Sequence, residues 1–517
     1  MKRMKGLSAI LFGIAFLMLI SISARAYEAQ DIIHPASPVP KINAPRVTGT
    51  TPGRPFLFLI PATGEKPLSF SAKNLPANLS LDPKTGIITG TVEKEGEYAV
   101  EVSVSNAKGK AVRKLTIVAG KGKLALTPPM GWNSWNVWGL SVDADKVKAA
   151  ADAMIASGLA ARGFQYVNID DGWEQGRDPE SSQCRGKTKE NNECGEIGRD
   201  AKGDILTNEK FPEMKALADY VHSKGLKLGI YSSPGPWTCG RYTATYQHEK
   251  QDAEMFAQWG IDYLKYDWCS YSEEKLGLSE KYFRKPYEVM RAELDGIDRD
   301  IVFSLCQYGM KKVWTWGAEV GGNLWRTTGD INDSWISLSS IGFKQYKLAP
   351  YSGPGHWNDP DMLVVGKVGW GPTLHESRLS QNEQIVHITM WAMLAAPLLI
   401  GCDMTNLDEF TLAVLTNEEL IEVDQDPLGK QATQVIDKDG AVVWMRPLWD
   451  GTIAVALFNK TESKLEVSVK WSELGISGSQ PARDLWLQKD LGSFDQSFSA
   501  QVSSHGAVLL KIGKPTK

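Results

Sequence analysis

The sequence predicts a multidomain α/β protein: a central (β/α)₈ barrel with a β-sandwich on each side of it in the chain. Two observations support this prediction. Between residues 124 and 425, short apolar strands alternate with helical segments, which is the pattern of parallel βαβ units. Residues 42–120 and 429–514 instead show short strands separated by turn residues, which is typical of antiparallel sheets.

Composition excludes several classes of partner. The chain has 517 residues, of which 42% are hydrophobic and 23% charged, as in soluble globular proteins. A net charge of −4 gives no reason to expect a nucleic acid or an anionic membrane as partner. After the N-terminal leader, no run of roughly 20 apolar residues predicts a membrane span. The oligomeric state cannot be predicted.

The first 26 residues have the three parts of a secretory signal peptide. Met1–Lys5 is basic, Leu7–Ile20 is apolar but short for a membrane span, and Ala24-Arg25-Ala26 is a small-x-small cleavage site. We therefore expect a periplasmic or secreted protein that is cut near Ala26. Residues 27–41 are rich in Pro and Ala and are interpreted as a linker.

Residues 42–120 form the first predicted sandwich. Phe56–Ile60, Tyr98–Val104 and Lys114–Val118 are its expected strands, and Asp82–Gly86 has the chemistry of a turn. The phrase from Leu75 to Gly90 resembles the Ig-like modules of bacterial secreted proteins. Because the segment has no catalytic cluster, we expect a spacer or a weak binding module.

Eight strand candidates make up the barrel. They are Met130–Trp132, Tyr166–Asp171, Leu226–Tyr231, Asp262–Asp267, Ile301–Leu305, Asn323–Thr327, Gly355–Leu363 and Pro397–Ile400. Helices are expected at 144–159, 211–224, 250–259 and 287–294. The clearest strands of the C-terminal sandwich are Ala441–Met445, Thr452–Phe458 and Ala507–Ile512.

The fourth barrel strand ends in Lys265 and Asp267. Side chains two residues apart on a strand point the same way, so the two charges are expected to lie together. Lys265 would then lower the pKa of Asp267 and keep it ionised, which suits a nucleophile. A structural ion pair at a strand end is the alternative interpretation.

Polar and aromatic residues follow the predicted strands at the end where barrel enzymes keep their sites. They are Trp132, Asp170, Asp171, Trp173, Tyr231, Lys265, Asp267, Cys306, Gln307, Tyr308, Arg326, Asp330, Asp359 and Asp361. Carboxylates bind sugar hydroxyls, aromatic faces cover sugar C–H patches, and two acids can hydrolyse a glycosidic bond. Any single Asp could instead cap a helix, but agreement across so many strands disfavours that interpretation.

The six cysteines lie between 184 and 402. Cys184 and Cys194 share a polar loop and are predicted to form a disulfide. Cys306 and Cys402 are expected to be free thiols. Metal-ligand spacings such as C-x-x-C or H-E-x-x-H are absent from the sequence, so neither a metal nor another cofactor is expected.

Residues 124–512 resemble glycoside hydrolase family 27, which contains α-galactosidases and α-N-acetylgalactosaminidases. The resemblance rests on six dense motifs. They are P-P-M-G-W-N-S-W-N (128–136), I-D-D-G-W (169–173), L-A-D-Y-V-H-S-K-G-L-K-L-G-I-Y (217–231), W-G-I-D-Y-L-K-Y-D-W-C (259–269), W-R-T-T-G-D-I (325–331) and W-N-D-P-D-M-L (357–363).

The resemblance implies a role for each matching residue. Asp267 would be the nucleophile, with a low pKa, and Asp330 the general acid/base, with a raised one. Asp170 and Asp171 would hold the sugar's O4 and O6. The remaining roles it implies are Trp132 closing the C6 side, Lys265 at O3 and O4, Arg326 at O2, and Tyr231 and Asp361 lining the pocket. Cys239 and Cys269 match a family disulfide.

Three departures from the family pattern affect specificity. Where many α-galactosidases have C-E-W, this chain has Cys306-Gln307-Tyr308. The resemblance implies that this segment faces the sugar's C2. Ser233 stands where Asp is common. Residues 175–198 form an insertion beside the expected pocket mouth.

The resemblance implies a retaining exo-α-galactosidase that acts on oligo- or polysaccharides by double displacement. One alternative is a β-L-arabinopyranosidase, whose sugar lacks C6, and Asp170 and Asp171 favour a pocket made for O6. An α-N-acetylgalactosaminidase is a second alternative, for which bulky Tyr308 leaves little room. A non-catalytic sugar-binding protein is the third, which the presence of both carboxylates disfavours.

Overall fold

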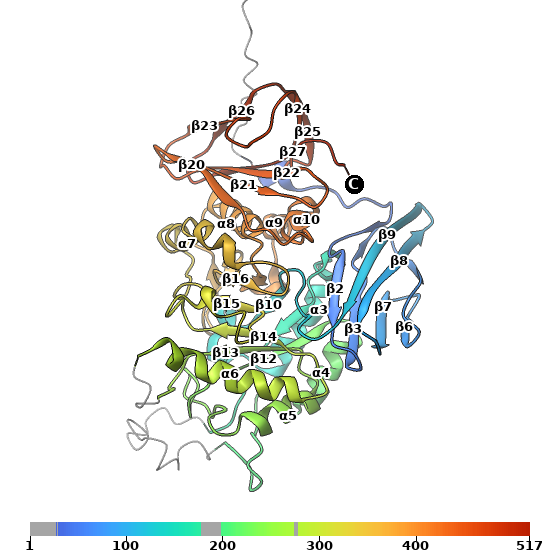
Figure 1. The fold of residues 1–517 in the computed structure, drawn as a ribbon, viewed down its shortest axis with the longest axis vertical. Helices are drawn as coiled ribbons and strands as arrows, with labels where there is room; N and C mark the ends of the chain where they lie inside the picture. The colour runs from blue at the N-terminus through green and yellow to red at the C-terminus, as the bar shows by residue number, and fades with distance from the viewer. Residues whose placement is uncertain (1–26, 28, 177–197, 273–277, 517) are drawn as a thin grey trace, which may run out of the picture.

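The chain folds around a ring of eight parallel strands (Figure 1). The computed structural model describes residues 27, 29–176, 198–272 and 278–516. The ring follows the order β16-β15-β14-β13-β12-β11-β10-β19. Its strands are β10 Met130–Asn133, β11 Tyr166–Asn168, β12 Lys227–Ser232, β13 Tyr263–Asp267, β14 Val302–Cys306, β15 Leu324–Arg326, β16 Trp357–Asp359 and β19 Leu398–Ile400. Each predicted strand is present, and the predicted barrel is confirmed.

The ring closes between β16 and β19 through residues beyond the end of β16. Leu363 pairs with Ile400 in parallel, and its N–H donates to Leu399 O at 2.8 Å. The predicted strand 355–363 is interrupted because Pro360 has no N–H to donate and Asp361 has a φ of 90°. The break places Asp361 outside the regular ladder.

Helices pack around the ring, as the alternation predicts. Their bounds are α2 Trp135–Trp138, α3 Ala144–Ala156, α4 Met214–Ser223, α5 Glu249–Trp259, α6 Glu280–Gly296, α7 Trp335–Gly342, α8 Gln381–Leu394, α9 Glu409–Thr416 and α10 Glu418–Asp424. Several begin at a side-chain cap: Asp143 accepts from Lys146 N before α3, and Ser380 forms a capping box with Glu383 before α8. Among the described residues, none of the helices is long and apolar enough to cross a membrane.

The C-terminal sandwich packs on α8, which is buried on all sides from Glu383 to Leu394. This helix is buried around its circumference because it separates two layers. Arg446 donates to Ala392 O at 2.6 Å, and the indole N–H of Trp486 donates to Thr389 Oγ1 at 2.9 Å. The strands are β20 Thr433–Lys438, β21 Ala441–Pro447, β22 Ile453–Asn459, β23 Leu465–Lys470, β24 Gln480–Asp484, β25 Lys489–Phe494, β26 Ser497–Val502 and β27 Ala507–Ile512.

The N-terminal sandwich lies beside the barrel, with its own core (Figure 1). One sheet has the order β2-β9-β8-β5 and the other β3-β7-β6. The strands are β1 Lys41–Ile42, β2 Val47–Thr50, β3 Pro55–Leu59, β4 Ala62–Thr63, β5 Ser69–Lys73, β6 Leu79–Leu81, β7 Ile87–Thr91, β8 Gly96–Asn106 and β9 Gly109–Ala119. All pairs are antiparallel except β2 with β9. Asp300 joins the module to the barrel by accepting from Thr51 N at 2.7 Å, and Arg113 forms a two-pronged ion pair with Glu422.

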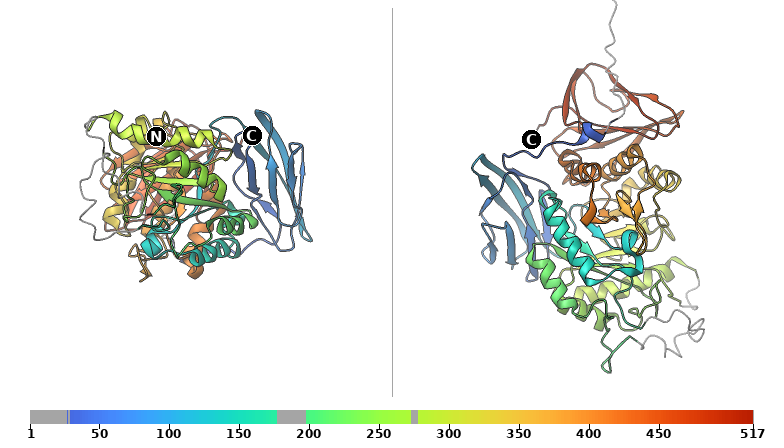
Figure 2. Two further views of the ribbon diagram at one scale, coloured as in Figure 1. Left: turned by 90° about the horizontal axis from the view of Figure 1, so that it is seen from below. Right: turned by 180° about the vertical axis from the view of Figure 1, so that it is seen from behind.

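The segment before the first sandwich lies against the C-terminal sandwich (Figure 2). Tyr27 is 8% exposed and its hydroxyl donates to Asp484 Oδ2 at 2.9 Å. Ile32, in α1 (Ala29–Ile32), is buried, and His34 Nε2 lies 2.9 Å from Trp486 O. The stretch interpreted as a linker is therefore attached to a domain more than 400 residues further along the chain.

Candidate active site

The predicted site residues lie at the carboxyl ends of the barrel strands. Trp132 is in β10, Tyr231 in β12, Lys265 and Asp267 in β13, Cys306 at the end of β14 and Arg326 at the end of β15. Asp170 and Asp171 follow β11, Tyr308 follows β14, Asp330 follows β15 and Asp361 follows β16. Because parallel strands all end on one face, these side chains share the end of the barrel where loops build catalytic sites.

Asp267 sits in the middle of this cluster and is 6% exposed. The hydroxyl of Tyr308 donates to its Oδ1 at 2.7 Å, and the hydroxyl of Tyr231 donates to its Oδ2 at 3.2 Å. Burial raises the pKa of Asp267, and this effect outweighs the lowering by Lys265 and by the Tyr308 hydrogen bond. The prediction of a net lowered pKa was therefore wrong, because the sequence did not reveal how deeply this carboxylate is buried.

Lys265 forms its ion pair with a different carboxylate. Its Nζ lies 2.7 Å from Asp170 Oδ2, and it lies over the Tyr231 ring at 5.3 Å. Burial opposes the charge on Lys265, but Asp170 and Asp267 outweigh burial and hold the pKa of the lysine well above its usual value. Lys265 therefore stays charged and is paired with the carboxylate that follows the second barrel strand.

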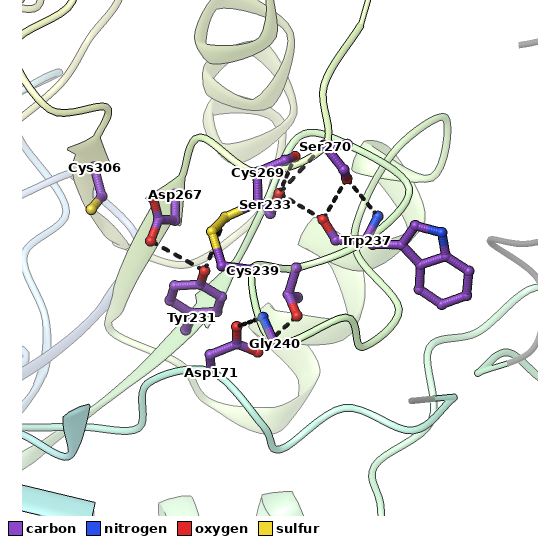
Figure 3. Close-up of a disulfide and its surroundings, with 12 residues drawn as sticks. Asp171, Tyr231, Ser233, Trp237, Cys239, Gly240, Asp267, Cys269, Ser270 and Cys306 are labelled. Carbon is purple, nitrogen blue, oxygen red and sulfur yellow. Dashed lines mark hydrogen bonds between the residues drawn. A yellow bond between two sulfur atoms is a disulfide. The ribbon is translucent and has the colours of Figure 1, made fainter. Parts of the chain in front are cut away.

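Asp171 is held by a loop that follows β12. Thr238 Oγ1 donates to its Oδ1 at 2.8 Å. Gly240 N donates to its Oδ2 at 2.5 Å (Figure 3). Burial and the neighbouring Asp170 and Asp267 raise the pKa of Asp171 to about 7, against the lowering effect of both donors. Sequence reasoning missed Thr238 and Gly240, although both flank Cys239.

The predicted disulfide between Cys239 and Cys269 is present, with a Cα–Cα distance of 5.2 Å (Figure 3). It ties the loop that holds Asp171 to the residue two positions after Asp267. Sulfur and carboxylate atoms of Cys239, Cys269 and Asp267 lie within 4.8 Å of one another. Since both sulfurs are in the disulfide, no thiolate is available there as a metal ligand.

The other cysteines divide into two groups. Cys306 and Cys402 are free and buried, as predicted. Burial raises the pKa of both thiols. The predicted Cys184–Cys194 disulfide lies outside the described residues.

Asp330 lies on the loop after β15, and its side chain is 64% exposed. Arg326 Nη2 contacts Asp330 Oδ1 at 2.9 Å and Asp361 Oδ2 at 2.8 Å. Asp361 Oδ2 also accepts from Ile331 N at 2.9 Å, and its Oδ1 accepts from Met362 N. Asp361, expected to line the pocket, therefore uses Oδ2 to hold two neighbours of Asp330, namely Arg326 and Ile331.

Two of the departures from the family pattern, at Gln307-Tyr308 and at Ser233, lie in the described part of the chain. Gln307 is fully buried and its Nε2 donates to Met310 O at 3.1 Å, so it supports its own turn. Tyr308 is the residue of this segment that reaches Asp267. Ser233 Oγ donates to Cys269 O at 2.8 Å, beside the disulfide. Most of the insertion 175–198 lies outside the described residues.

Two further residues complete the surroundings. Trp132 is 1% exposed, and its indole N–H donates to Cys402 O at 2.9 Å. Glu174, which sequence reasoning missed, is fully buried and accepts from Gly172 N at 3.2 Å. Burial and Asp171 raise the pKa of Glu174 well above its usual value. Burial therefore favours the protonated form of Glu174.

Comparison with known proteins agrees with this geometry. The family profile "Alpha galactosidase A" matches residues 127–426, the "Alpha galactosidase C-terminal beta sandwich domain" matches 438–512, and the "Putative Ig domain" matches 38–120. An α-galactosidase from Cyamopsis tetragonoloba is 41% identical over 419 residues, which cover 80% of this chain and 91% of that protein.

Solved structures give the same result. A Bacteroides fragilis structure named "putative alpha-galactosidase/melibiase" has a TM-score of 0.84 and 36% identity, covering 94% of this chain and 100% of that chain. A family 27 β-L-arabinopyranosidase from Geobacillus stearothermophilus has a TM-score of 0.65 and 29% identity, covering 75% and 98%. The barrel and its carboxylates define a glycoside hydrolase. This chain belongs to the α-galactosidase (melibiase) family, glycoside hydrolase family 27.

Proposed function

We propose that this chain is a retaining exo-α-galactosidase that removes terminal α-D-galactosyl residues from oligo- or polysaccharides. The observation that carries the proposal is a buried Asp267 with a hydroxyl donor on each oxygen, on the same barrel face as a largely exposed Asp330. The relatives named α-galactosidases support the choice of sugar.

Asp267 would attack C1 of the galactosyl residue while Asp330 protonates the departing glycosidic oxygen. The first bond formed is an ester between Asp267 and C1. Asp330, now ionised, would take a proton from water, and the water oxygen would attack C1 and release Asp267. The exposed position of Asp330 suits a group that exchanges protons with leaving groups and water.

Asp170 and Asp171 are proposed to bind the hydroxyls that identify galactose. Each carboxylate oxygen can accept two hydrogen bonds. Asp171 receives one donor on each oxygen from Thr238 and Gly240, which leaves one acceptor position on each oxygen. A pair of such carboxylates favours a sugar with O6, and therefore galactose over L-arabinopyranose.

A panel of nitrophenyl glycosides tests the sugar assignment. The α-galactoside should give the highest kcat/KM among α-galactoside, β-L-arabinopyranoside and α-N-acetylgalactosaminide. Asp171→Ala should weaken transition-state binding of the galactoside by about 1.5–3 kcal/mol, the value of a hydrogen bond to a charged group. The arabinopyranoside is the control, because a sugar without C6 should lose less. A higher kcat/KM for the arabinopyranoside in the unaltered enzyme would overturn the assignment.

We also propose that the protein is exported to the periplasm or beyond, with cleavage near Ala26. The support is the basic, apolar and small-x-small pattern of residues 1–26. N-terminal sequencing of protein recovered from its source cells should start close to Tyr27. Recovery of intact Met1 in the cytoplasm would contradict export.

A further inference from the structure

The turn after β14 holds Tyr308 in a backbone conformation that side chains of its size seldom adopt. Tyr308 has a φ of 64° and Gly309 a φ of 79°. A Cβ on Gly309 would lie 2.2 Å from Thr327 O, so this position requires glycine. Non-glycine residues in the left-handed region cluster at functional sites, where the surrounding structure maintains them.

Neighbouring side chains fix the same turn. Gln307 is fully buried and donates from Nε2 to Met310 O, and Met310 N donates back to Gln307 O at 3.2 Å. The guanidinium of Arg326 lies 5.8 Å from the Tyr308 ring. The Tyr308 ring therefore has a hydrogen-bonded turn behind it and a buried cation beside it.

That hydroxyl reaches Asp267. The Tyr308 hydroxyl donates to Asp267 Oδ1 at 2.7 Å, whereas the Tyr231 hydroxyl donates to Oδ2 at 3.2 Å. The shorter contact is made by the residue in the strained turn. Hydrogen bonds to an ionised acceptor are short and are about twice as strong as neutral ones.

We propose that Tyr308 is a catalytic residue, which donates a hydrogen bond to the nucleophile Asp267 and acts most strongly when the carboxylate charge returns in the second step. This inference rests on the proposed function, since it takes Asp267 as the nucleophile. It assigns to Tyr308 a role distinct from contact with the sugar's C2 side.

The electron balance of the two steps explains why the donor matters. In the first step, a lone pair of one Asp267 oxygen forms the bond to C1, the C1–O bond breaks, and the leaving oxygen takes the proton of Asp330. The carboxylate charge is lost in the ester. In the second step, water oxygen bonds to C1 and gives a proton to Asp330, and the C1–Asp267 electron pair returns to the carboxylate. The Tyr308 hydroxyl stabilises that returning charge.

The same donor favours the ionised form of Asp267 in the free enzyme. Several charged or titratable groups surround Asp267, and they are Lys265 on its own strand, Asp170 and Asp171 after β11, Tyr231 in β12, Cys306 in β14, Tyr287 in α6 and Arg326 in β15. Burial raises the pKa of Asp267, while Lys265, Tyr308 and Arg326 lower it. Loss of the Tyr308 hydroxyl therefore raises this pKa further.

The test compares Tyr308→Phe with Tyr231→Phe, using Tyr351→Phe as the control for the same chemical change at an exposed position. Tyr308→Phe should lower kcat on nitrophenyl α-galactoside roughly 10- to 100-fold, the effect of one hydrogen bond to a charged group. kcat/KM should fall less, and intact mass spectra should show galactosyl-enzyme accumulating. The acidic limb of the pH profile should move to higher pH. Tyr231→Phe should have a smaller effect and Tyr351→Phe none.

Two measurements distinguish a failure of this inference from a failure of the proposed function. Turnover of the α-galactoside by the unaltered enzyme tests the function alone. The pKa of Asp267, followed by carboxyl ¹³C titration of aspartate-labelled protein and assigned with Asp267→Asn, tests the donor without turnover. It should rise in Tyr308→Phe. An unchanged Asp267 pKa, or an active enzyme in which Tyr308→Phe alters only KM, would overturn the role given to Tyr308.

Discussion

The two carboxylates proposed for catalysis are held by different kinds of structure. Asp267 belongs to a barrel strand, is 6% exposed, and has a tyrosine hydroxyl on each oxygen. Asp330 belongs to a loop, is 64% exposed in its side chain, and is oriented by Arg326. The barrel therefore fixes the group that must meet C1, whereas the loop carries the group that must exchange protons with different partners.

The largest effect on activity is expected from the loss of Asp267, the carboxylate on the barrel strand. Asp267→Ala should reduce kcat on the order of 10⁴-fold or more for every substrate, because no neighbouring oxygen can take over the bond to C1. Binding of galactose, measured by calorimetry, should persist, since Asp170 and Asp171 remain. Turnover within tenfold of the unaltered enzyme would exclude Asp267 as nucleophile.

Loss of Asp330, the carboxylate on the loop, is expected to lower activity by an amount that depends on the substrate. Asp330→Ala should slow substrates with poor leaving groups roughly 10²- to 10⁴-fold, the range of general acid–base catalysis. Activated aryl galactosides should keep a fast first step, because they need little protonation. Azide should restore turnover by attacking the ester and should yield α-galactosyl azide. Formation of the β-azide by this variant would reverse the two assignments.

A substitution that leaves Asp330 unchanged can weaken the interactions that hold its loop. Asp361→Asn removes one partner of buried Arg326, which is 3% exposed. Breaking a buried ion pair in this way should lower the free energy of unfolding by about 3–5 kcal/mol. Denaturant titration measures this, with exposed Asp145→Asn as the control. The general-acid step should slow as well, and an unchanged stability would show that Asp361 does not hold the loop.

Asp171 adds an effect on stability that depends on pH. Its pKa is about 7 in the folded chain, against the ordinary 3.8. Between these values the folded state keeps the proton while the unfolded state loses it, so stability is fully present below pH 3.8 and falls until about pH 7. The fall can reach roughly 4 kcal/mol. Denaturant titrations at several pH values should show that Asp171→Asn removes this fall in the free energy of unfolding. If the free energy of unfolding depends on pH equally in both proteins, the raised pKa is contradicted.

The sequence predicted the strands of the barrel more completely than the contacts within the site. All eight barrel strands were found because apolar runs alternate with helices and end in polar residues. The sequence prediction ran one strand through residues 355–363. It missed that Pro360 interrupts this strand and that Asp361 lies outside the regular ladder. The extended stretch before residue 41 was interpreted as a linker, because the partners of Tyr27 lie more than 400 residues away.

Contacts within the site were harder to predict than its members. The spacing of Lys265 and Asp267 placed them on one side of a strand, but Lys265 pairs with Asp170 on another strand. The pKa of Asp267 depends on burial, which strand periodicity does not measure. Thr238 and Gly240, which donate hydrogen bonds to Asp171, lie in an irregular loop. In the sequence, only the predicted disulfide of the neighbouring Cys239 indicated that this loop lies near Asp267.

The central claim is that Asp267 forms a covalent intermediate with the help of Asp330, and the stereochemistry of the product tests it directly. Proton NMR of an α-galactoside reaction, recorded before mutarotation, shows which anomer of galactose appears first. Two displacements at C1 predict α-galactose as the first product. β-Galactose appearing first would mean a single displacement by water, and the roles given to Asp267, Asp330 and Tyr308 would all be wrong.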